Sequence, residues 1–154
     1  MQVDLLWKFL ASLGYPMIEN VAAFFENLSP DCVENLDKLY AANIRFQDPV
    51  NTGEGLDDLK AIFEDLFKQL KELKMTTVSR QGDEKSGSME WVMSYKFRGK
   101  SRELPGGSWF EFDQAGKIRA QRDYWDAGEG IYREFPGLGF VLGRIKKLVR
   151  VRPK

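Results

Sequence analysis

The first half of the chain carries apolar residues at helical spacing. A helix is expected over residues 4–13, a second over 18–28, and a third from Ser29 onward, where Ser-Pro-Asp is typical of a helix start. The strongest apolar stripe predicts a fourth helix and consists of Leu56, Leu59, Ile62, Phe63, Leu66, Phe67, Leu70 and Leu73. The first half is therefore predicted to be mainly helical.

The second half changes to a period of two. Between Met89 and Phe97 every second residue is apolar, which is typical of a half-buried strand. Turn signals at Gly82-Asp83, Gly106-Gly107 and Ala115-Gly116 divide this half into about four strands, near 76–81, 88–98, 102–113 and 117–126. A short strand is also expected over 42–47, followed by a loop at 51–55. Helices followed by an antiparallel meander predict an α+β fold, with helices on one face of a curved sheet.

The composition removes several classes of chemistry. The length of 154 residues fits a single domain. The chain has no histidine, which excludes Ser-His-Asp and Cys-His catalysis and imidazole zinc sites. The one cysteine, Cys32, excludes an intrachain disulfide and fits a reducing compartment, so a cytoplasmic location is expected. No ligand spacing indicates a metal, and the glycines at 137–143 do not match a dinucleotide fingerprint, so we expect neither metal nor cofactor.

Charge is zero overall but unevenly distributed. Residues 1–74 hold 13 acids and 7 bases, whereas residues 75–154 hold 10 acids and 16 bases. The last 18 residues contain six bases and no acid. No base-reading element accompanies them, so no specific nucleic acid is expected as a partner. No signal peptide is evident, and no stretch approaches the 18 uncharged apolar residues that indicate a membrane span.

A basic amphipathic helix is predicted near the C-terminus. Its apolar face consists of Leu138, Val141, Leu142, Ile145, Leu148 and Val149. Helices of this kind bind anionic membrane surfaces, so one interpretation is peripheral membrane contact through residues 137–154. The other interpretation, which we favour, is that the apolar face packs on its own domain or on a dimer mate.

Two segments are similar to one known superfamily. FQDPVNTGEGLDDLKAIF at 46–63 resembles the ketosteroid-isomerase segment in which a strand ends in Asp-Pro-Val, and DQAGKIRAQRDYWD at 113–126 resembles the last strand of SnoaL-like proteins. The chain thus resembles the nuclear-transport-factor-2-like superfamily, in its SnoaL-like and ketosteroid-isomerase-like branch, over about residues 17–126. GIYREFPGLGFVLGRIKKLVR resembles the basic C-terminal helix of some uncharacterised bacterial SnoaL-like proteins, so 128–152 is taken as a helical extension of a single domain, 1–154.

The resemblance implies a cone, in which a strongly bent antiparallel sheet wraps around the N-terminal helices and opens into an apolar pocket for a small hydrophobic ligand. It also implies a homodimer, because the outer sheet face of such folds is usually covered. In ketosteroid isomerases the position of Asp48 holds the general base. The tyrosine and the protonated aspartate that form the oxyanion site there correspond to Phe24 and Ser108, so the steroid reaction is not expected.

The last strand supplies the second candidate. Alternation places Gln121, Asp123 and Trp125 on one face, and the family pattern implies that this face meets the cavity. A last-strand aspartate is implied to act as acid or base in SnoaL-like cyclases, although the usual histidine two residues earlier is Gln121. An enzyme would then use Asp48 and Asp123 as its catalytic pair. The substrate would contact Gln121, Tyr95 and Ser108 as polar groups, and Trp91, Trp125 and Phe24 as pocket wall.

Structural interpretations of the same residues stay open. An aspartate before proline commonly forms a turn and accepts hydrogen bonds from nearby backbone amides, which would explain Asp48. Asp123 would pair equally well with Arg45 or Arg119 across the sheet. Two functions therefore remain: a cofactor-independent isomerase, cyclase or hydrolase, or a non-catalytic carrier of a lipid-like ligand, associated with a membrane surface through its C-terminal helix.

Overall fold

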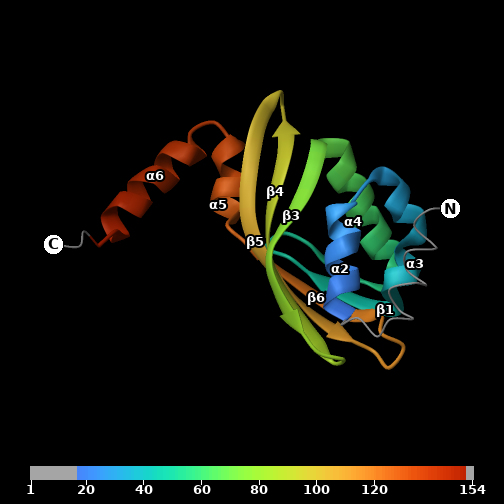
Figure 1. Cartoon of the computed structure of the whole chain (residues 1–154). Helices are drawn as coiled ribbons and strands as arrows, with labels where there is room; N and C mark the ends of the chain where they lie inside the picture. The colour runs from blue at the N-terminus through green and yellow to red at the C-terminus, as the bar shows by residue number, and fades with distance from the viewer. Residues whose placement is uncertain (1–16, 152–154) are drawn as a thin grey trace.

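A strongly curved sheet forms one layer of the protein, and helices cover its concave face (Figure 1). The computed structural model describes residues 17–151, so the helix expected over 4–13 lies outside the described residues. The sheet has six strands in the order β2-β1-β6-β5-β4-β3. They are β1 (Tyr40–Gln47), β2 (Thr52–Glu54), β3 (Lys71–Gly82), β4 (Ser86–Phe97), β5 (Lys100–Phe112) and β6 (Ile118–Trp125). The predicted α+β class and curved sheet are confirmed.

One strand pairing departs from the predicted antiparallel sheet. β1 runs parallel to β6, while every other neighbouring pair is antiparallel. A parallel neighbour needs a long crossover connection, and the chain between β1 and β6 supplies it. The pairing brings Gln47, at the end of β1, beside Arg122 in β6. Because the two strands run parallel, the next residues along each of them, Asp48 and Asp123, also lie close together.

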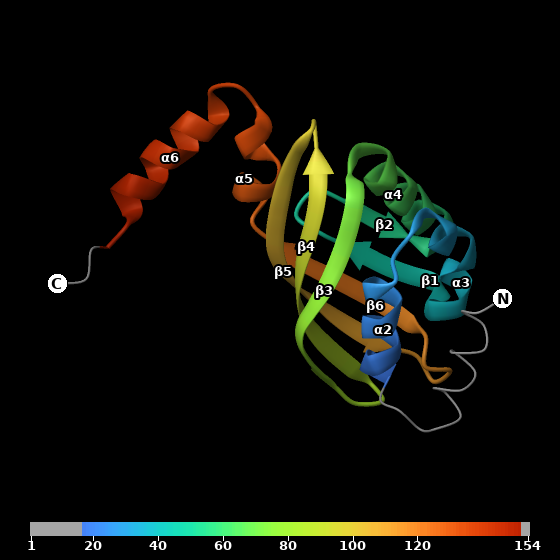
Figure 2. The same cartoon turned by 45° about the horizontal axis from the view of Figure 1, so that its top comes forward.

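Four helical segments lie against the concave face. They are α2 (Met17–Glu26), the 3-10 helix η1 (Pro30–Asn35), α3 (Leu36–Leu39) and α4 (Gly55–Gln69). α2 packs on β3 and β4, and α4 packs on β1 (Figures 1 and 2). The side chains enclosed between helices and sheet form one core, whose most deeply buried members are Val21, Tyr40, Ile44, Leu59, Phe110 and Ile118. Removal of this apolar surface from water holds the two layers together.

The longest helix ends earlier than the apolar stripe predicts. α4 stops at Gln69, and Leu70 already has an extended backbone. β3 begins at Lys71 instead of near residue 76. Leu73 fits the helical stripe, but its spacing of two from the buried Met75 also fits the inner face of a strand, and both residues lie in β3. The sequence pattern is compatible with both periods here, and sheet pairing with β4 decides between them.

Two predicted irregular segments belong to strands. The loop expected at 51–55 contains β2, which pairs with β1, and Gly55 begins α4 with a φ of 81°. The turn expected at Gly106-Gly107 is wrong, because both glycines lie inside β5. The hairpin between β4 and β5 turns instead at Gly99, where φ is 77°. Gly106 is needed because the Trp91 ring covers its Cα.

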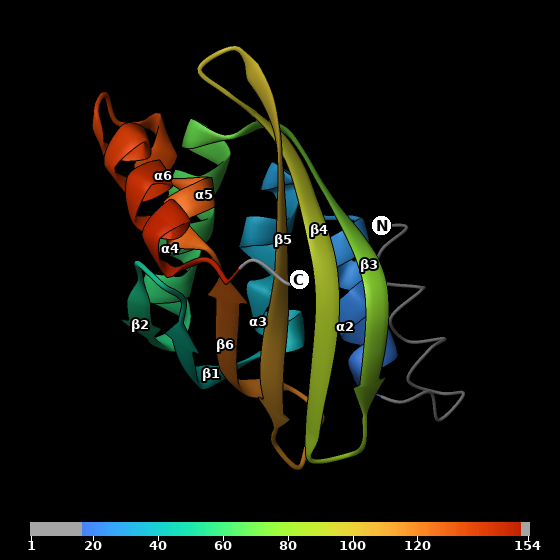
Figure 3. The ribbon, with the colours of Figure 1, turned by 90° about the vertical axis from the view of Figure 1, so that its left-hand side faces the viewer.

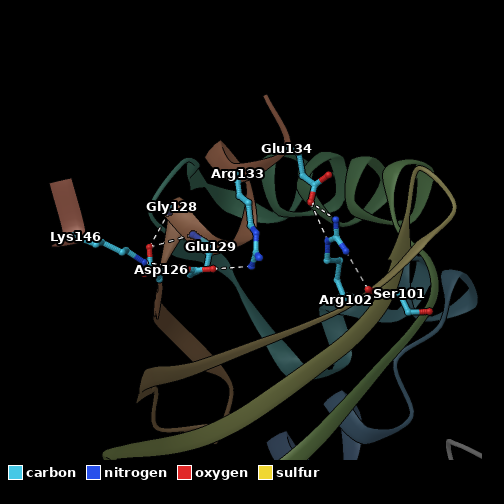
Figure 4. A network of polar contacts seen from close by, with 8 residues as sticks. All are labelled: Ser101, Arg102, Asp126, Gly128, Glu129, Arg133, Glu134 and Lys146. Carbon is cyan, nitrogen blue, oxygen red and sulfur yellow. Dashed lines mark hydrogen bonds and ion pairs between the residues drawn. The ribbon is translucent and has the colours of Figure 1, made fainter. Parts of the chain in front are cut away.

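The C-terminal region forms a separate arm. After β6 come α5 (Ala127–Gly130), η2 (Tyr132–Glu134) and α6 (Leu138–Val149). Arg102 of β5 donates two hydrogen bonds to one Glu134 oxygen, at 2.8 and 2.7 Å, which ties η2 to the sheet (Figure 4). α6 projects away from the cone and has no buried residue (Figures 1 and 3). Packing of this apolar face on its own domain is therefore wrong, whereas packing on a dimer mate stays a prediction.

Candidate functional site

A cluster of polar side chains lies on the inner face of the sheet. Asp123 in β6 stands opposite Ser108 in β5, and Gln121 lies two residues before it on the same face. Ser108 and Gln121 are only 5% and 3% exposed, and Asp123 is half-buried. Arg122 and Tyr124 point outward and are exposed. The alternation predicted for this strand is confirmed, and it places one carboxyl group among buried side chains.

Hydrogen bonds converge on this carboxyl group from both sides. Ser108 Oγ and Gln121 Nε2 both donate to Asp123 Oδ1, at 2.6 and 2.9 Å. Behind them, Trp91 Nε1 donates to Ser108 Oγ at 2.9 Å, and Tyr40 Oη donates to Gln121 Oε1 at 2.8 Å. Two chains of hydrogen bonds, from Tyr40 through Gln121 and from Trp91 through Ser108, thus end at Asp123 Oδ1. Such networks polarise their members and hold the acceptor in one orientation.

The two oxygens of Asp123 have different surroundings. Oδ1 accepts both hydrogen bonds of the network. Among residues 17–151, no hydrogen bond reaches Oδ2. The only fully buried side-chain oxygen or nitrogen without a hydrogen-bond partner there is Asn20 Oδ1, so Asp123 Oδ2 is not fully buried. The network therefore orients the carboxyl group through one oxygen and leaves the other without a hydrogen bond in the described part of the chain.

Burial raises the pKa of Asp123 to about 6. The charge of Asp48 adds to the rise, while the hydrogen bonds from Ser108 and Gln121 oppose it because they stabilise the carboxylate. Burial and the charge of Asp123 also raise the pKa of Tyr40 well above its ordinary value, so that hydroxyl remains a neutral donor. A carboxyl group titrating near neutrality can both take and return a proton.

Asp48 has the contacts of a turn former. Its Oδ1 accepts from the backbone amides of Val50 and Asn51, at 2.7 and 2.6 Å, and its Oδ2 accepts from the Asn51 side chain at 3.0 Å. This is the turn interpretation of an Asp-Pro sequence. Asp48 nevertheless acts on the site through its charge, because the parallel pairing of β1 and β6 brings it close to Asp123.

Replacing Asp48 by asparagine is expected to lower the pKa of Asp123. The amide keeps an oxygen for the turn but removes the negative charge that disfavours ionisation of its neighbour. An NMR titration that follows the side-chain carboxyl carbon of Asp123 measures the pKa shift directly and needs no substrate. An unchanged titration midpoint in Asp48→Asn would show that the two carboxylates are not coupled.

A family model for the SnoaL-like domain matches residues 21–121, which is most of the chain. The match includes the second half of α2, α4, β1 to β5, and β6 up to Gln121. The chain belongs to the SnoaL-like family. The predicted resemblance is confirmed. No curated protein matches the sequence.

Solved structures with the same fold are distant in sequence. A protein of ketosteroid-isomerase-like fold from Catenulispora acidiphila, in complex with trimethylamine, has a TM-score of 0.63 at 15% identity, covering 73% of this chain and 87% of its own. A SnoaL-like family protein from Agrobacterium tumefaciens has a TM-score of 0.58 at 15% identity, covering 71% and 94%. An epoxide hydrolase from M. tuberculosis has a TM-score of 0.59 at 13% identity, covering 86% and 92%. At these identities the likeness shows the fold alone.

The SnoaL-like domain brings together only some of the predicted site residues. Trp91, Ser108, Gln121 and Asp123 form one hydrogen-bonded cluster. Phe24 lies in the core, where its ring meets Tyr40 edge-on at 6.3 Å. The structure places Trp125 one position beyond the cluster on β6, with its ring against Gly130 of α5.

Tyr95 is buried but lies apart from this cluster. Its partner across the sheet is Arg102, which is bound to Glu134. Burial and the charge of Glu134 raise the pKa of Tyr95, while Arg102 opposes the rise. The alternative ion pairs of Asp123 are wrong, because Arg45 and Arg119 both pair with Glu111 on the outer face.

Sequence reasoning missed Tyr40. It is fully buried at the start of β1 and donates the hydrogen bond that orients Gln121. The signal was its parity with the buried Ile44 and Phe46, since a tyrosine on a core-facing strand usually finds a partner for its hydroxyl. That partner is 81 residues away along the chain, so only the tertiary structure identifies it.

Proposed function

We propose that this SnoaL-like protein is a cofactor-independent acid–base enzyme acting on a small hydrophobic molecule, with Asp123 as the proton-transferring group. The observation that carries the proposal is the environment of its carboxyl group. One oxygen is held by Ser108 and Gln121, the other is free of protein hydrogen bonds within residues 17–151, and the pKa is about 6. At pH 7 roughly nine tenths of such a group is ionised and ready to accept a proton.

The simplest reaction is proton removal beside a carbonyl group. Asp123 Oδ2 takes the proton from the α-carbon, and the electron pair of the broken C–H bond moves onto the carbonyl oxygen as an enolate. Where a carbon–carbon double bond is conjugated with the enolate, the electron pair returns from the oxygen through that double bond. The protonated carboxyl then gives the proton to the far carbon of the double bond, which completes an isomerisation. The same group can instead take a proton from water that opens an epoxide, and give it back to the alkoxide that forms.

Asp48 contributes charge in this proposal. Its oxygens accept hydrogen bonds within its own turn, and its negative charge favours the protonated form of Asp123. Trp91 and Tyr40 act as positioning residues, because they touch Asp123 only through Ser108 and Gln121. Phe24 and Trp125 are proposed to shape the apolar surroundings of Asp123, and Tyr95 is proposed as a polar contact for a part of the substrate farther from the carboxyl group.

The test is a panel of small ketones and epoxides, assayed by deuterium uptake at the α-carbon and by diol formation. We expect turnover by the wild type and by Asp57→Asn, an exposed carboxylate of α4 that serves as the matched control. Turnover should be lost in Asp123→Asn. Equal turnover by both variants would overturn the assignment of Asp123.

The carrier interpretation gives a different result in native mass spectrometry. A carrier would keep a discrete added mass through purification, equally in wild type and Asp123→Asn, and would turn over nothing in the panel. The carrier interpretation is supported by the departure from the family pattern at Phe24, Ser108 and Gln121. A retained mass together with no turnover would favour the carrier over the enzyme.

The homodimer stays a prediction that the same spectrum tests. The outer face of the sheet exposes Trp109 and Tyr124, which line a groove of about 420 Å³ together with polar residues of β3 and β4. Exposed aromatic side chains of this size are typical of interfaces. A monomeric mass at micromolar concentration would contradict the prediction.

A further inference from the structure

The C-terminal arm carries an apolar surface that the rest of the described chain does not cover. α6 projects from the cone, and none of its residues is buried (Figures 1 and 2). Leu148 and Val149 are 84% and 73% exposed. Large apolar side chains gathered on one exposed face mark an interaction site. We infer that α6 docks this protein on an anionic lipid surface, independently of the chemistry proposed for Asp123.

Five of the six large apolar side chains that α6 exposes share one face of the helix. The sixth, Phe140, lies on the opposite face, where the Arg144 guanidinium stands 5.9 Å from the Phe140 ring centroid. At 100° per residue the five fall within an arc of about a third of the circumference. They are Leu138, Val141, Ile145, Leu148 and Val149. Leu142 of the same stripe is half-buried and faces Gly128 of α5. One edge of the stripe thus meets the domain, and the remainder is open to solvent.

Charge favours a lipid surface as the occupant. Residues 138–154 contain Arg144, Lys146, Lys147, Arg150, Arg152 and Lys154 and no acid. A second copy of α6 would offer these bases no acid with which to pair. Anionic headgroups complement them, and bases flanking an apolar stripe extend toward the headgroups while the stripe enters the acyl boundary.

Lys146 differs from the other bases of α6 because it forms ion pairs within the arm. Lys146 Nζ lies 2.6 Å from Glu129 Oε1 and 3.3 Å from Asp126 Oδ2, which fastens α6 to α5 (Figure 4). Asp126 also accepts from the backbone amide of Gly128, so the acceptor is itself held in place. Lys146 therefore links α6 to α5, while Arg144, Lys147 and Arg150 stay exposed for headgroups.

The dimensions fit a helix lying on a surface. Twelve residues of α6 span about 18 Å, well short of the hydrocarbon thickness of a bilayer. Within the described residues, no helix is long and apolar enough to cross a membrane.

Vesicle sedimentation of the full chain tests the inference. The probes are phosphatidylcholine vesicles with and without about 30% phosphatidylglycerol, which provide an anionic and a neutral surface. We expect binding to the anionic vesicles only, weakened by high salt. Replacing Arg144, Lys147 and Arg150 by serine should lower the partition coefficient on the order of a hundredfold, at about fivefold for each base.

Matched controls separate the charge and apolar contributions. Serine at Lys68, Lys74 and Lys85 removes the same charge from the exposed surface of the domain and should leave most binding intact. Val149→Asp should abolish binding, whereas Val78→Asp, an exposed valine of β3, should not. Equal binding by the two serine triples would overturn the inference. A second result would also overturn it: the wild type does not bind vesicles, and light scattering shows a dimer for the wild type but a monomer for Val149→Asp. A second copy of the chain would then be the occupant of this face.

Discussion

Asp123→Asn is expected to lower turnover by about 10²- to 10⁴-fold, the usual contribution of a positioned general acid or base. The amide has the shape of the carboxyl group and keeps an oxygen for the hydrogen bonds from Ser108 and Gln121, so the packing around it should survive. It cannot exchange a proton near neutral pH. Steady-state kinetics on whichever substrate the ketone and epoxide panel identifies measures the loss.

The same substitution should stabilise the protein at high pH. The folded pKa of Asp123, about 6, lies above its unfolded value, so the folded state binds the proton more tightly. In the wild type, the stability linked to this proton is fully present below the unfolded pKa and is lost as pH rises through the folded pKa of about 6. By pH 8 ionised Asp123 is expected to cost up to about 3 kcal/mol, which asparagine avoids.

Urea unfolding of both proteins at pH 5 and pH 8 measures this difference. The gain of Asp123→Asn over the wild type should be about half as large at pH 5 as at pH 8. Asp57→Asn serves as the control, since its carboxylate is exposed. Equal gains at both pH values would mean that burial does not raise the pKa, and that the loss of turnover needs another explanation.

Gly106→Ala is expected to destabilise the fold by about 3 kcal/mol, at the upper end for overpacked positions. A Cβ at Gly106 would lie 2.3 Å from the nearest atom of the Trp91 ring, with two more ring atoms at 2.6 and 2.7 Å. The ring has to move, and its Nε1 donates to Ser108, so the cluster around Asp123 moves with it. Urea unfolding measures the destabilisation, and the NMR titration of Asp123 measures the change at the site.

The neighbouring glycine provides the control. A Cβ at Gly107 would meet only Met89 O at 3.5 Å, which is ordinary van der Waals contact. Because alanine in a strand loses less backbone freedom than glycine on folding, Gly107→Ala should change stability by less than about 1 kcal/mol. If both alanine variants were equally stable, the close approach of Trp91 to β5 would be refuted.

The local pattern of the sequence was sufficient for most elements of the fold. Alternation in the second half predicted the long strands, because one face of the sheet is buried and the other is not. It also placed Gln121, Asp123 and Trp125 on one face. The pattern failed where two periods agreed with the same residues, at Leu70 and Leu73, and where glycines served a close approach instead of a turn, at Gly106 and Gly107.

What the sequence determined by itself is the family, the α+β cone and the pair of candidate carboxylates, Asp48 and Asp123, since each depends on residues near one another along the chain. Only the tertiary structure decided between the two carboxylates and how Asp123 is held. Tyr40 and Trp91 reach it from strands far away in sequence, and the parallel pairing of β1 with β6 brings the charge of Asp48 to it. A pKa is set by burial and by neighbouring charges in space, which no local pattern contains. The position of α6 likewise depends on contacts across the arm, among them the packing on η2 and the ion pairs of Lys146.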